Sequence, residues 1–318
     1  MKVLQRLQDT AGLPFPIVTI GNFDGLHLGH RAVLKLVKQR AQDLNGTVIV
    51  LTFDPHPLRV LAPEVELKFL SDPTEKLALL QEAGVDVVVR LPFTPQFAAQ
   101  TPEEFMRDVL SKELGSKELY VGQNFRFGQG RRGTIETLLE AAPRLGFTVR
   151  AISPVVVNGV PVSSTRIRDL LQSGAVADAA AMLGRPYVLE GRVIRGDGRG
   201  GELGYPTANM LPPQGRVLPA DGVYAAEVQL DAQLFPGVSY IGSRPTFGSG
   251  ARLIEVHLLA GAQDLYEREI GVSFHARLRE DMVFDSPAQL ARQIAVDVGM
   301  TREVLRGLSP MHTRVSLR

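Results

Sequence analysis

The stretch Gly21-Asn-Phe-Asp-Gly-Leu-His-Leu-Gly-His30 directly follows the apolar run Ile17–Ile20 and opens a segment with helical periodicity. His27 and His30 are spaced i, i+3, so both imidazoles lie on one face of a first helical turn. The free N–H groups and positive dipole end of such a turn attract anions. Glycines let the backbone approach an anion closely. We therefore predict a phosphate site here, against the alternative of surface histidines beside a glycine turn.

The first half of the chain alternates between strand and helix patterns. Two helix starts, Asp72–Glu75 and Thr101–Glu104, each combine a cap residue, Pro at the first helical position and Glu at the third. Apolar runs rich in β-branched residues predict strands over 17–20, 47–53, 85–91, 119–122 and 147–152. This alternation predicts a doubly wound, Rossmann-like parallel sheet that binds ligands beyond the carboxyl ends of its strands.

The pattern changes in the second half. Two short helices are predicted over 165–172 and 176–183, and Gly184-Arg-Pro186 then interrupts the helical pattern. Short alternating runs follow at 187–194, 223–229, 238–241, 253–259 and 271–278. They predict an antiparallel β-barrel or sandwich. Ser286 should cap a terminal helix that Gly299 ends, with Thr301 starting another. The predicted domains are 1–184 (α/β) and 185–318 (all-β with a terminal helix).

Composition excludes several classes of protein. The chain has 318 residues, no Cys and a net charge of +1, which excludes a disulfide scaffold, a thiolate metal site and a Cys nucleophile. Residues 1–184 carry 20 basic and 19 acidic side chains and residues 185–318 carry 15 of each, so neither half has the excess of a nucleic-acid or membrane binder. We expect a cytoplasmic protein with small-molecule partners; a weak homo-oligomer stays compatible with the sequence.

A second phosphate contact is predicted at Ser163-Ser-Thr-Arg-Ile-Arg168, at the start of the helix over 165–172. Ser and Thr before a helix are ordinary N-caps, which is the structural alternative. Two Arg residues in the same turn favour phosphate, because their forked donors match its oxygens. Together with His27 and His30, this segment would hold a triphosphate from two sides, which points to nucleotidyl transfer.

Two further loops follow strand ends, Thr52–Pro57 and Gly122–Gly133. Phe125 and Phe127, set among Arg126, Arg131 and Arg132, would stack on a flat aromatic ligand and hold its phosphate. A loop with solvated arginines is the alternative on composition alone.

The β half contains a glycine-rich run, Gly191–Asn209, which ends in Pro-Thr-Ala-Asn. Backbone N–H groups of such a loop can wrap phosphates. Thr207 and Asn209 offer neutral oxygens on one face of an extended segment, which suits Mg²⁺. Glu255, a carboxylate among apolar residues of the strand over 253–259, is a candidate general base. A plain glycine turn and an outward-facing strand residue are the alternatives.

Taken together, these motifs resemble the prokaryotic bifunctional riboflavin kinase/FMN adenylyltransferases over roughly residues 17–298. The Gly21–His30 stretch, the Thr52–Pro57 loop, Asn-Phe-Arg-Phe-Gly at 124–128 and Ser163–Arg168 are similar to the adenylyltransferase module. Gly191–Asn209, Gly242-Ser-Arg-Pro-Thr-Phe247 and Glu255-Val-His257 are similar to the kinase module. Thr134 and Glu267 depart from the family pattern, which commonly has Asp and Gly at these positions.

The resemblance implies a role for each matching residue. His27 and His30 would act in adenylyl transfer, and Glu255 would take the proton of the riboflavin 5′-hydroxyl. ATP in the adenylyltransferase would contact Gly21, Phe23, Asp24, His27, His30, Ser164, Thr165 and Arg168. Its flavin would contact Asn124, Phe125 and Arg126. In the kinase, ATP would contact Gly191, Gly196, Gly200, Thr207 and Asn209, Mg²⁺ would bind Thr207 and Asn209, and the flavin would contact Arg279. Riboflavin, FMN and ATP are the implied substrates.

Two other functions compete with this interpretation. One is a single-activity nucleotidylyltransferase whose β-domain binds flavin or regulates without catalysis. The other is an RNA-binding or tRNA-charging protein, since His-x-Gly-His also opens a helix in class I synthetases. The balanced charge argues against the second alternative, because polyanion binding needs an excess of basic residues.

Overall fold

The computed structural model describes residues 1–196, 199–243, 252–260 and 265–308, and it divides into two compact units, Met1–Ser163 and Ser164–Arg318. Each unit is described by itself. Among the described residues, no helix has both the length and the apolarity to cross a bilayer. Part of the predicted Gly242–Phe247 motif, residues 244–247, lies outside the described residues, as do Asp197 and Gly198 of the glycine-rich run.

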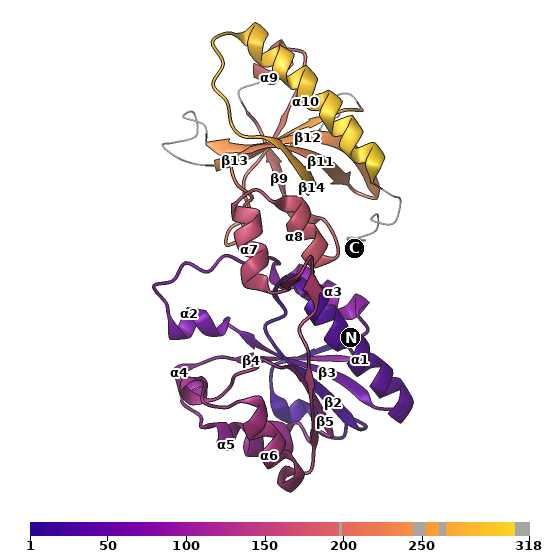
Figure 1. Cartoon of the computed structure of the whole chain (residues 1–318), viewed down its shortest axis with the longest axis vertical. Helices are drawn as coiled ribbons and strands as arrows, with labels where there is room; N and C mark the ends of the chain where they lie inside the picture. Colours follow the sequence, from indigo (N-terminus) through magenta and orange to yellow (C-terminus); the bar gives the residue numbers. More distant parts are fainter. Residues whose placement is uncertain (197–198, 244–251, 261–264, 309–318) are drawn as a thin grey trace. The chain divides into compact units, whose positions relative to one another are not determined.

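The first unit is built on a six-stranded parallel sheet with the order β1-β4-β3-β2-β5-β6 (Figure 1). The five predicted strands are confirmed. The sixth strand, β1, was not predicted: its three mostly exposed residues are too short to show a period. The strand bounds are β1 (Lys2–Leu4), β2 (Pro16–Ile20), β3 (Thr47–Asp54), β4 (Val87–Pro92), β5 (Glu118–Gly122) and β6 (Thr148–Ile152).

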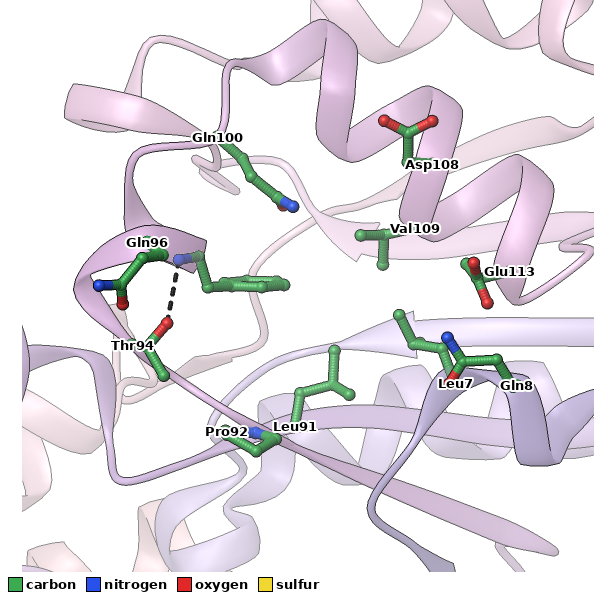
Figure 2. A pocket seen from close by; sticks show the side chains of 11 residues that line it. Leu7, Gln8, Leu91, Pro92, Thr94, Gln96, Gln100, Asp108, Val109 and Glu113 are labelled. Carbon is green, nitrogen blue, oxygen red and sulfur yellow. Dashed lines mark hydrogen bonds between the residues drawn. The ribbon is translucent and has the colours of Figure 1, made fainter.

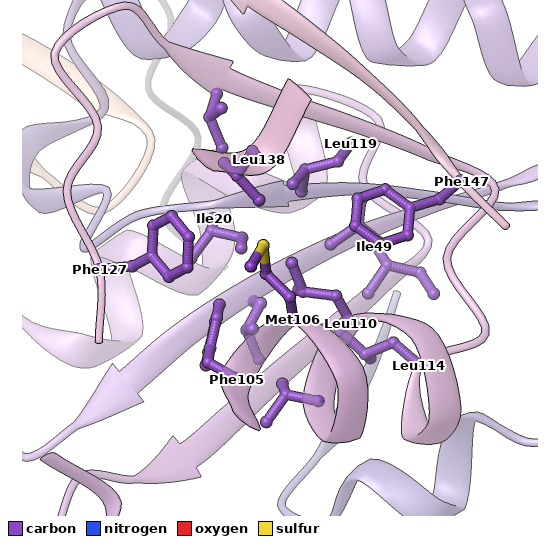
Figure 3. Close-up of a cluster of buried hydrophobic side chains, with 14 of the residues drawn as sticks. Ile20, Ile49, Phe105, Met106, Leu110, Leu114, Leu119, Phe127, Leu138 and Phe147 are labelled. Atoms are coloured by element: carbon purple, nitrogen blue, oxygen red, sulfur yellow. The ribbon is translucent and has the colours of Figure 1, made fainter. Parts of the chain in front are cut away.

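Alternate residues of the strands enter two separate cores, one on each face of this sheet. On β3, Ile49 and Leu51 join one core, and Val48 and Val50 join the other. The first core is covered by helices α5 (Pro102–Glu104), η3 (Phe105–Glu113, a π-helix) and α6 (Ile135–Leu145) (Figure 3). The second is covered by α1 (Leu28–Leu44) and α3 (Pro73–Glu82). Helices on both faces explain why the strands are almost uniformly apolar.

Smaller elements complete the first unit: η1 (Leu7–Thr10), η2 (Asp24–Leu26), α2 (Pro57–Leu61), α4 (Pro95–Ala98), η4 (Gln129–Arg131) and the β7 (Val156–Val157) and β8 (Val160–Pro161) pair. The predicted caps are present. The Asp72 side chain accepts hydrogen bonds from the backbone N–H groups of Thr74 and Glu75, and Thr101 forms a capping box with Glu104.

The strand order reverses at β2, which lies between β3 and β5. After β2 the chain moves outward through β3 and β4, and it then returns to the other side of β2 as β5. In open parallel sheets, ligands bind at the carboxyl ends of strands where the order reverses. The Gly21–His30 loop after β2 and the loop after β5 therefore begin at neighbouring strand ends.

The second unit starts with two helices, α7 (Ser164–Gln172) and α8 (Val176–Leu183), and continues as a closed antiparallel barrel with the order β10-β13-β12-β11-β14-β9. The predicted antiparallel β-barrel is confirmed, and the sandwich alternative is excluded. The short strand β10 was not predicted. The barrel elements are β9 (Tyr187–Ile194), α9 (Arg199–Glu202), β10 (Ala208–Met210), β11 (Gly222–Leu230), β12 (Gln233–Ser243), β13 (Arg252–Leu258) and β14 (Glu269–Arg279).

The terminal helix corrects one prediction. Ser286 caps it as expected, but α10 (Pro287–Gly307) continues through Gly299 as one helix (Figure 1, yellow). Ile294 and Val298 pack against the barrel, and the Thr301 hydroxyl donates to the backbone oxygen of Asp297. These tertiary contacts outweigh the roughly 1 kcal/mol that a helical glycine costs relative to alanine.

Candidate active sites

His27 is the N-cap of α1. Its Nδ1 accepts a hydrogen bond from the backbone N–H of His30 at 3.3 Å, which requires a neutral ring with its proton on Nε2. The two imidazole rings stack, with centroids 3.7 Å apart and planes 14° apart. The predicted placement of both rings in the first turn is confirmed. The sequence did not show that one ring caps the helix and packs on the other.

His30 is held in its neutral form as well. Burial, followed by the proximity of His27, lowers the pKa of His30 well below its usual value. Its Nδ1 is buried and has no hydrogen-bond partner among the described residues. The first turn of α1 therefore presents two uncharged imidazoles, which avoids placing cations at the positive end of the helix.

The loop before α1 has an uncommon backbone. Phe23 and Leu26 have φ values of +49° and +38°, a left-handed conformation that costs a non-glycine residue about 1–2 kcal/mol. Phe23 is 2% exposed, and a Cβ on Gly21 would lie 3.2 Å from its ring. Gly21 thus makes room for Phe23 inside the turn. Such conformations persist only where the surrounding structure imposes them, commonly at functional sites.

Asp24 imposes part of that shape. Its buried carboxylate accepts hydrogen bonds from the backbone N–H groups of Leu70 and Ser71 at 3.0–3.1 Å, and the Ser71 hydroxyl accepts from the N–H of Gly25. Asp24 was predicted as an ATP contact. Its bonds to Leu70 and Ser71 fix the loop against the segment before α3, and the ATP contact stays a prediction.

The aromatic and polar residues of the loop after β5 differ in how far they are exposed to solvent. Asn124 and Arg126 are exposed and Phe125 is half-buried. Phe127 does not fit the prediction of a ring open to a ligand: it is 7% exposed, belongs to the core and stacks on Phe125 with centroids 5.6 Å apart. Thr134, the first departure from the family pattern, is the N-cap of α6. Thr and Asp both fill that position well, so the departure preserves the local structure.

The loop after β3 begins beyond Asp54 and leads into the short helix α2. His56 caps the short helix α2 by accepting the N–H of Leu58, and Asp54 pairs with Arg90 at 3.6 Å.

Ser164, Thr165 and Arg168 lie in the first turns of α7, as predicted. Thr165 is exposed, and Ser164 and Arg168 are half-buried. These residues open the second unit, whereas the histidine pair belongs to the first.

The barrel brings Asn209 and Glu255 together. They are directly opposite in the β10–β13 register, and Glu255 is directly opposite Tyr240 in the β13–β12 register. Opposed residues of antiparallel strands share a face. Asn209 is 7% exposed and Glu255 4% exposed. The half-buried Thr207 precedes Asn209 by two residues and shares its side of the extended segment.

Tyr240 was missed by sequence reasoning, because strand register cannot be inferred from one strand. Its hydroxyl donates to Asp281 at 3.1 Å. Burial, with the nearby carboxylates of Asp281 and Glu255, raises the pKa of Tyr240 to about 12. The phenol therefore remains a neutral hydrogen-bond donor beside Glu255.

The predicted nucleotide-binding glycines pack against β10. A Cβ on Gly196 would overlap the amide of Asn209, and one on Gly200 would lie 2.5 Å from the backbone oxygen of Tyr205 and 3.1 Å from the Thr207 hydroxyl. A Cβ on Gly191 would lie 2.9 Å from Met210. Gly196 and Gly200 of the glycine-rich run thus lie so close to Asn209 and Thr207 that a larger residue would not fit without a shift.

Arg279 has a partner that the sequence did not indicate. Its guanidinium donates to the carboxylate of Asp297 on α10 at 2.9–3.2 Å, and both side chains are largely buried. This bidentate pair joins β14 to the terminal helix. Glu267, the second departure from the family pattern, has a φ of +62°. Glycine adopts this conformation without strain, which accounts for the common glycine at this position.

The fold and the two sites define a class of two-module proteins. One module is a parallel-sheet unit of the nucleotide-binding type, and the other is a β-barrel with a buried carboxylate beside a glycine-rich run. Comparison with known proteins gives the family. The FAD synthetase family model matches residues 14–166, and the riboflavin kinase family model matches residues 183–305.

The chain is 40% identical to the bifunctional riboflavin kinase/FMN adenylyltransferase of Escherichia coli (strain K12) over 306 residues, covering 95% of this chain and 97% of that protein. The Pseudomonas fluorescens protein of the same name is 40% identical and covers 90% of this chain and 92% of its own length. The chain belongs to the bifunctional riboflavin kinase/FMN adenylyltransferase family. The alternative of a barrel without catalysis is not favoured, since both enzyme modules match.

One solved structure shares the fold over nearly the whole chain. A Streptococcus pneumoniae chain described as a macrolide-efflux protein has a TM-score of 0.86 and 29% identity, covering 97% of this chain and all of that one.

Proposed function

We propose that this protein converts riboflavin to FMN in its barrel and FMN to FAD in its parallel-sheet unit, with ATP as the second substrate of both steps. The observation that carries this proposal is the match of one chain to the models of both enzyme modules. The kinase step comes first, because its product is the acceptor of the second step.

In the adenylyltransferase, the neutral N–H groups of His27 and His30 and the first turn of α1 bind the phosphates of ATP. The geometry that supports this is the capping contact and the 3.7 Å ring stack, which fix both imidazoles at one helix end. A phosphate oxygen of FMN attacks the α-phosphorus, the bond to the β-phosphate breaks, and pyrophosphate leaves. Hydrogen-bond donors held in position stabilise the negative charge of the transition state in such a reaction, and no covalent intermediate with the protein is needed.

The remaining contacts of this reaction are proposed from the motifs that resemble the family. Ser164, Thr165 and Arg168 bind phosphate oxygens from the first turns of α7, and Gly21 and Phe23 shape the loop. Asn124, Phe125 and Arg126 contact the flavin, with Phe125 offering the partly buried ring. Asp24 contacts ATP as well, and its hydrogen bonds to Leu70 and Ser71 hold the loop in place.

In the kinase, the Glu255 carboxylate accepts the proton of the riboflavin 5′-hydroxyl as that oxygen attacks the γ-phosphorus of ATP, and ADP leaves. Gly191, Gly196 and Gly200 of the glycine-rich run contact ATP through their backbone. A general base of this kind contributes about 10²–10⁴ in rate. Arg279 contacts the flavin of the kinase, and its bond to Asp297 on α10 supports this by fixing the guanidinium in one position.

Mg²⁺ fits the donor set of the kinase. Thr207 and Asn209 supply neutral oxygens, with Glu255 opposite Asn209. The described residues contain no cluster of three or more His, Asp or Glu side chains that could hold a metal ion. Mg²⁺ commonly binds through few protein oxygens and the phosphates of its substrate. The metal, when bound, neutralises charge on the transferred phosphoryl group.

The same proposal covers organisation and location. We place the modules at 1–184 and 185–318, with small-molecule substrates as partners and no nucleic acid or membrane. A cytoplasmic location fits a chain without cysteine.

A time course of the purified protein with riboflavin, ATP and Mg²⁺, resolved by chromatography, tests the proposal. FMN should rise first and FAD second. If FAD forms only from added FMN, the kinase assignment fails; if neither flavin appears, both assignments fail.

A further inference from the structure

A cavity of about 470 Å³ lies at the end of β4, among η1, α4 and η3 (Figure 2). Its apolar walls are Leu7, Leu91, Phe97 and Val109, which also border the core on that face of the sheet. This volume is in the range of small-molecule sites. The histidine loop and α1 pack on the opposite face, so the cavity is separate from the predicted phosphate site.

The charge of the cavity differs from that of a nucleotide site. Among the described residues that line it, none is Lys or Arg, and two, Asp108 and Glu113, are acidic. Asp108 is paired with Arg107 at 2.6 Å, and its carboxylate points away from Val109 (Figure 2). The Glu113 carboxylate has no ion-pair or hydrogen-bond partner among the described residues. A phosphate would meet an uncompensated negative charge here.

The side chain of Gln100 also lines the cavity. The Oε1 atom of Gln100 is buried and accepts no hydrogen bond from the described residues. A buried acceptor without a donor is costly and calls for a partner. Figure 2 shows Gln100 and Glu113 at opposite ends of the cavity, with Val109 and Leu91 between them.

We propose that this cavity binds a small organic cation, with an apolar or aromatic body between Val109 and Leu91 and N–H donors that reach Gln100 Oε1 and the Glu113 carboxylate. The ligand is additional to ATP and to the flavin substrates. Phe97 of the cavity and Phe125 of the proposed flavin contacts pack on the same core, so displacement by FMN is the measurement that separates the two sites. The cavity lies wholly within the first unit, and its ligand is recognised by N–H donors and positive charge rather than by phosphate.

Benzamidine and benzoate are suitable probes, because they share a shape and carry opposite charges. Ligand-observed NMR on the full-length protein should show saturable binding of benzamidine, with a Kd on the order of 1 mM for so small a ligand, and no saturable binding of benzoate. Neither ATP nor FMN should displace benzamidine.

Three variants sharpen the test. Glu113→Gln and Gln100→Leu should each weaken benzamidine binding about tenfold, since each removes one acceptor. Asp108→Asn removes the same charge as Glu113→Gln from the same helix, but from a carboxylate that is already paired, so binding should change less than about twofold. Far-UV circular dichroism checks that all three variants remain folded.

The proposal is overturned if benzamidine shows no saturable binding, if benzoate binds equally well, or if Asp108→Asn weakens binding as much as Glu113→Gln does. Displacement of benzamidine by FMN would also overturn it, because the cavity would then belong to the flavin site.

Discussion

The two candidate active sites are assembled in different ways. The histidine site is one continuous loop and helix start after a parallel strand, so its main residues are neighbours in sequence. The barrel site takes Asn209, Glu255 and Tyr240 from three strands, and only antiparallel register brings them together. A site made of one continuous segment can be inferred from local sequence. For a site assembled by strand pairing, the sequence can indicate single residues but not which of them lie side by side.

The sharpest test of the comparison is to separate the activities. Glu255→Gln should lower FMN formation by about 10²–10⁴ because the general base is lost, while FAD formation from added FMN stays unchanged. Chromatographic assays of each step measure this. Glu269→Gln, an exposed carboxylate at the start of β14, is the control and should leave both steps intact. Equal loss of both steps would mean that Glu255 supports the whole chain rather than the kinase.

The reverse separation should follow from His30→Asn. Loss of one preorganised donor should lower FAD formation from FMN by about 10²–10³, with riboflavin phosphorylation retained. His275→Gln, which alters a barrel histidine bonded to Glu227, should leave FAD formation unchanged. Normal FAD formation by His30→Asn would remove this ring from the proposed phosphate contacts.

A smaller effect on kinase kcat/KM should distinguish two glycines of the glycine-rich run, Gly196 and Gly201. Gly196→Ala puts a methyl group into the Asn209 amide, whereas a Cβ on Gly201 meets no atom within 4 Å. Gly196→Ala should therefore reduce kinase kcat/KM about tenfold, equivalent to about 1.4 kcal/mol, and Gly201→Ala should change it less than twofold. Steady-state kinetics with varied ATP checks this pair. If the two variants behaved alike, the glycine-rich run would not be positioned by its contact with β10.

The smallest effect is a pH dependence of stability. Because burial and His27 hold the pKa of His30 well below 6.5 in the folded state, the unfolded chain binds a proton that the native chain does not as pH falls below that value. Stability is therefore present above this pH and lost below it, by at most about 1.4 kcal/mol per pH unit for this group. His30→Asn should flatten the slope in urea unfolding followed by circular dichroism. Equal slopes for the two proteins would contradict a depressed pKa.

Much of the architecture could be predicted from local patterns. The β-branched runs indicated β2 to β6, because strands buried on both faces are almost uniformly apolar. Cap residues such as Asp72 and Ser286 fixed helix starts, since side chains must satisfy the free N–H groups there.

The predictions that failed depended on distant contacts. Gly299 did not end α10, because the barrel packs on Ile294 and Val298. Phe127 was assigned to a ligand, but a core that includes Phe105 covers it. The pairing of Arg279 with Asp297 on α10 could not be predicted either, and the flavin contact of Arg279 stays a prediction. No local pattern in one strand or loop carries information about such partners.

The hydrogen bonds from Leu70 and Ser71 to Asp24 also bear on how the histidine site forms during folding. They join residues 46 and 47 positions apart, and contacts across long stretches of chain form late because closing the intervening loop costs entropy. We expect the first turn of α1 to become helical early, and its preceding loop to acquire the left-handed backbone only after residues 70–71 have docked. A nascent chain that has not yet placed those residues would have both histidines without the arrangement that is proposed to bind phosphate.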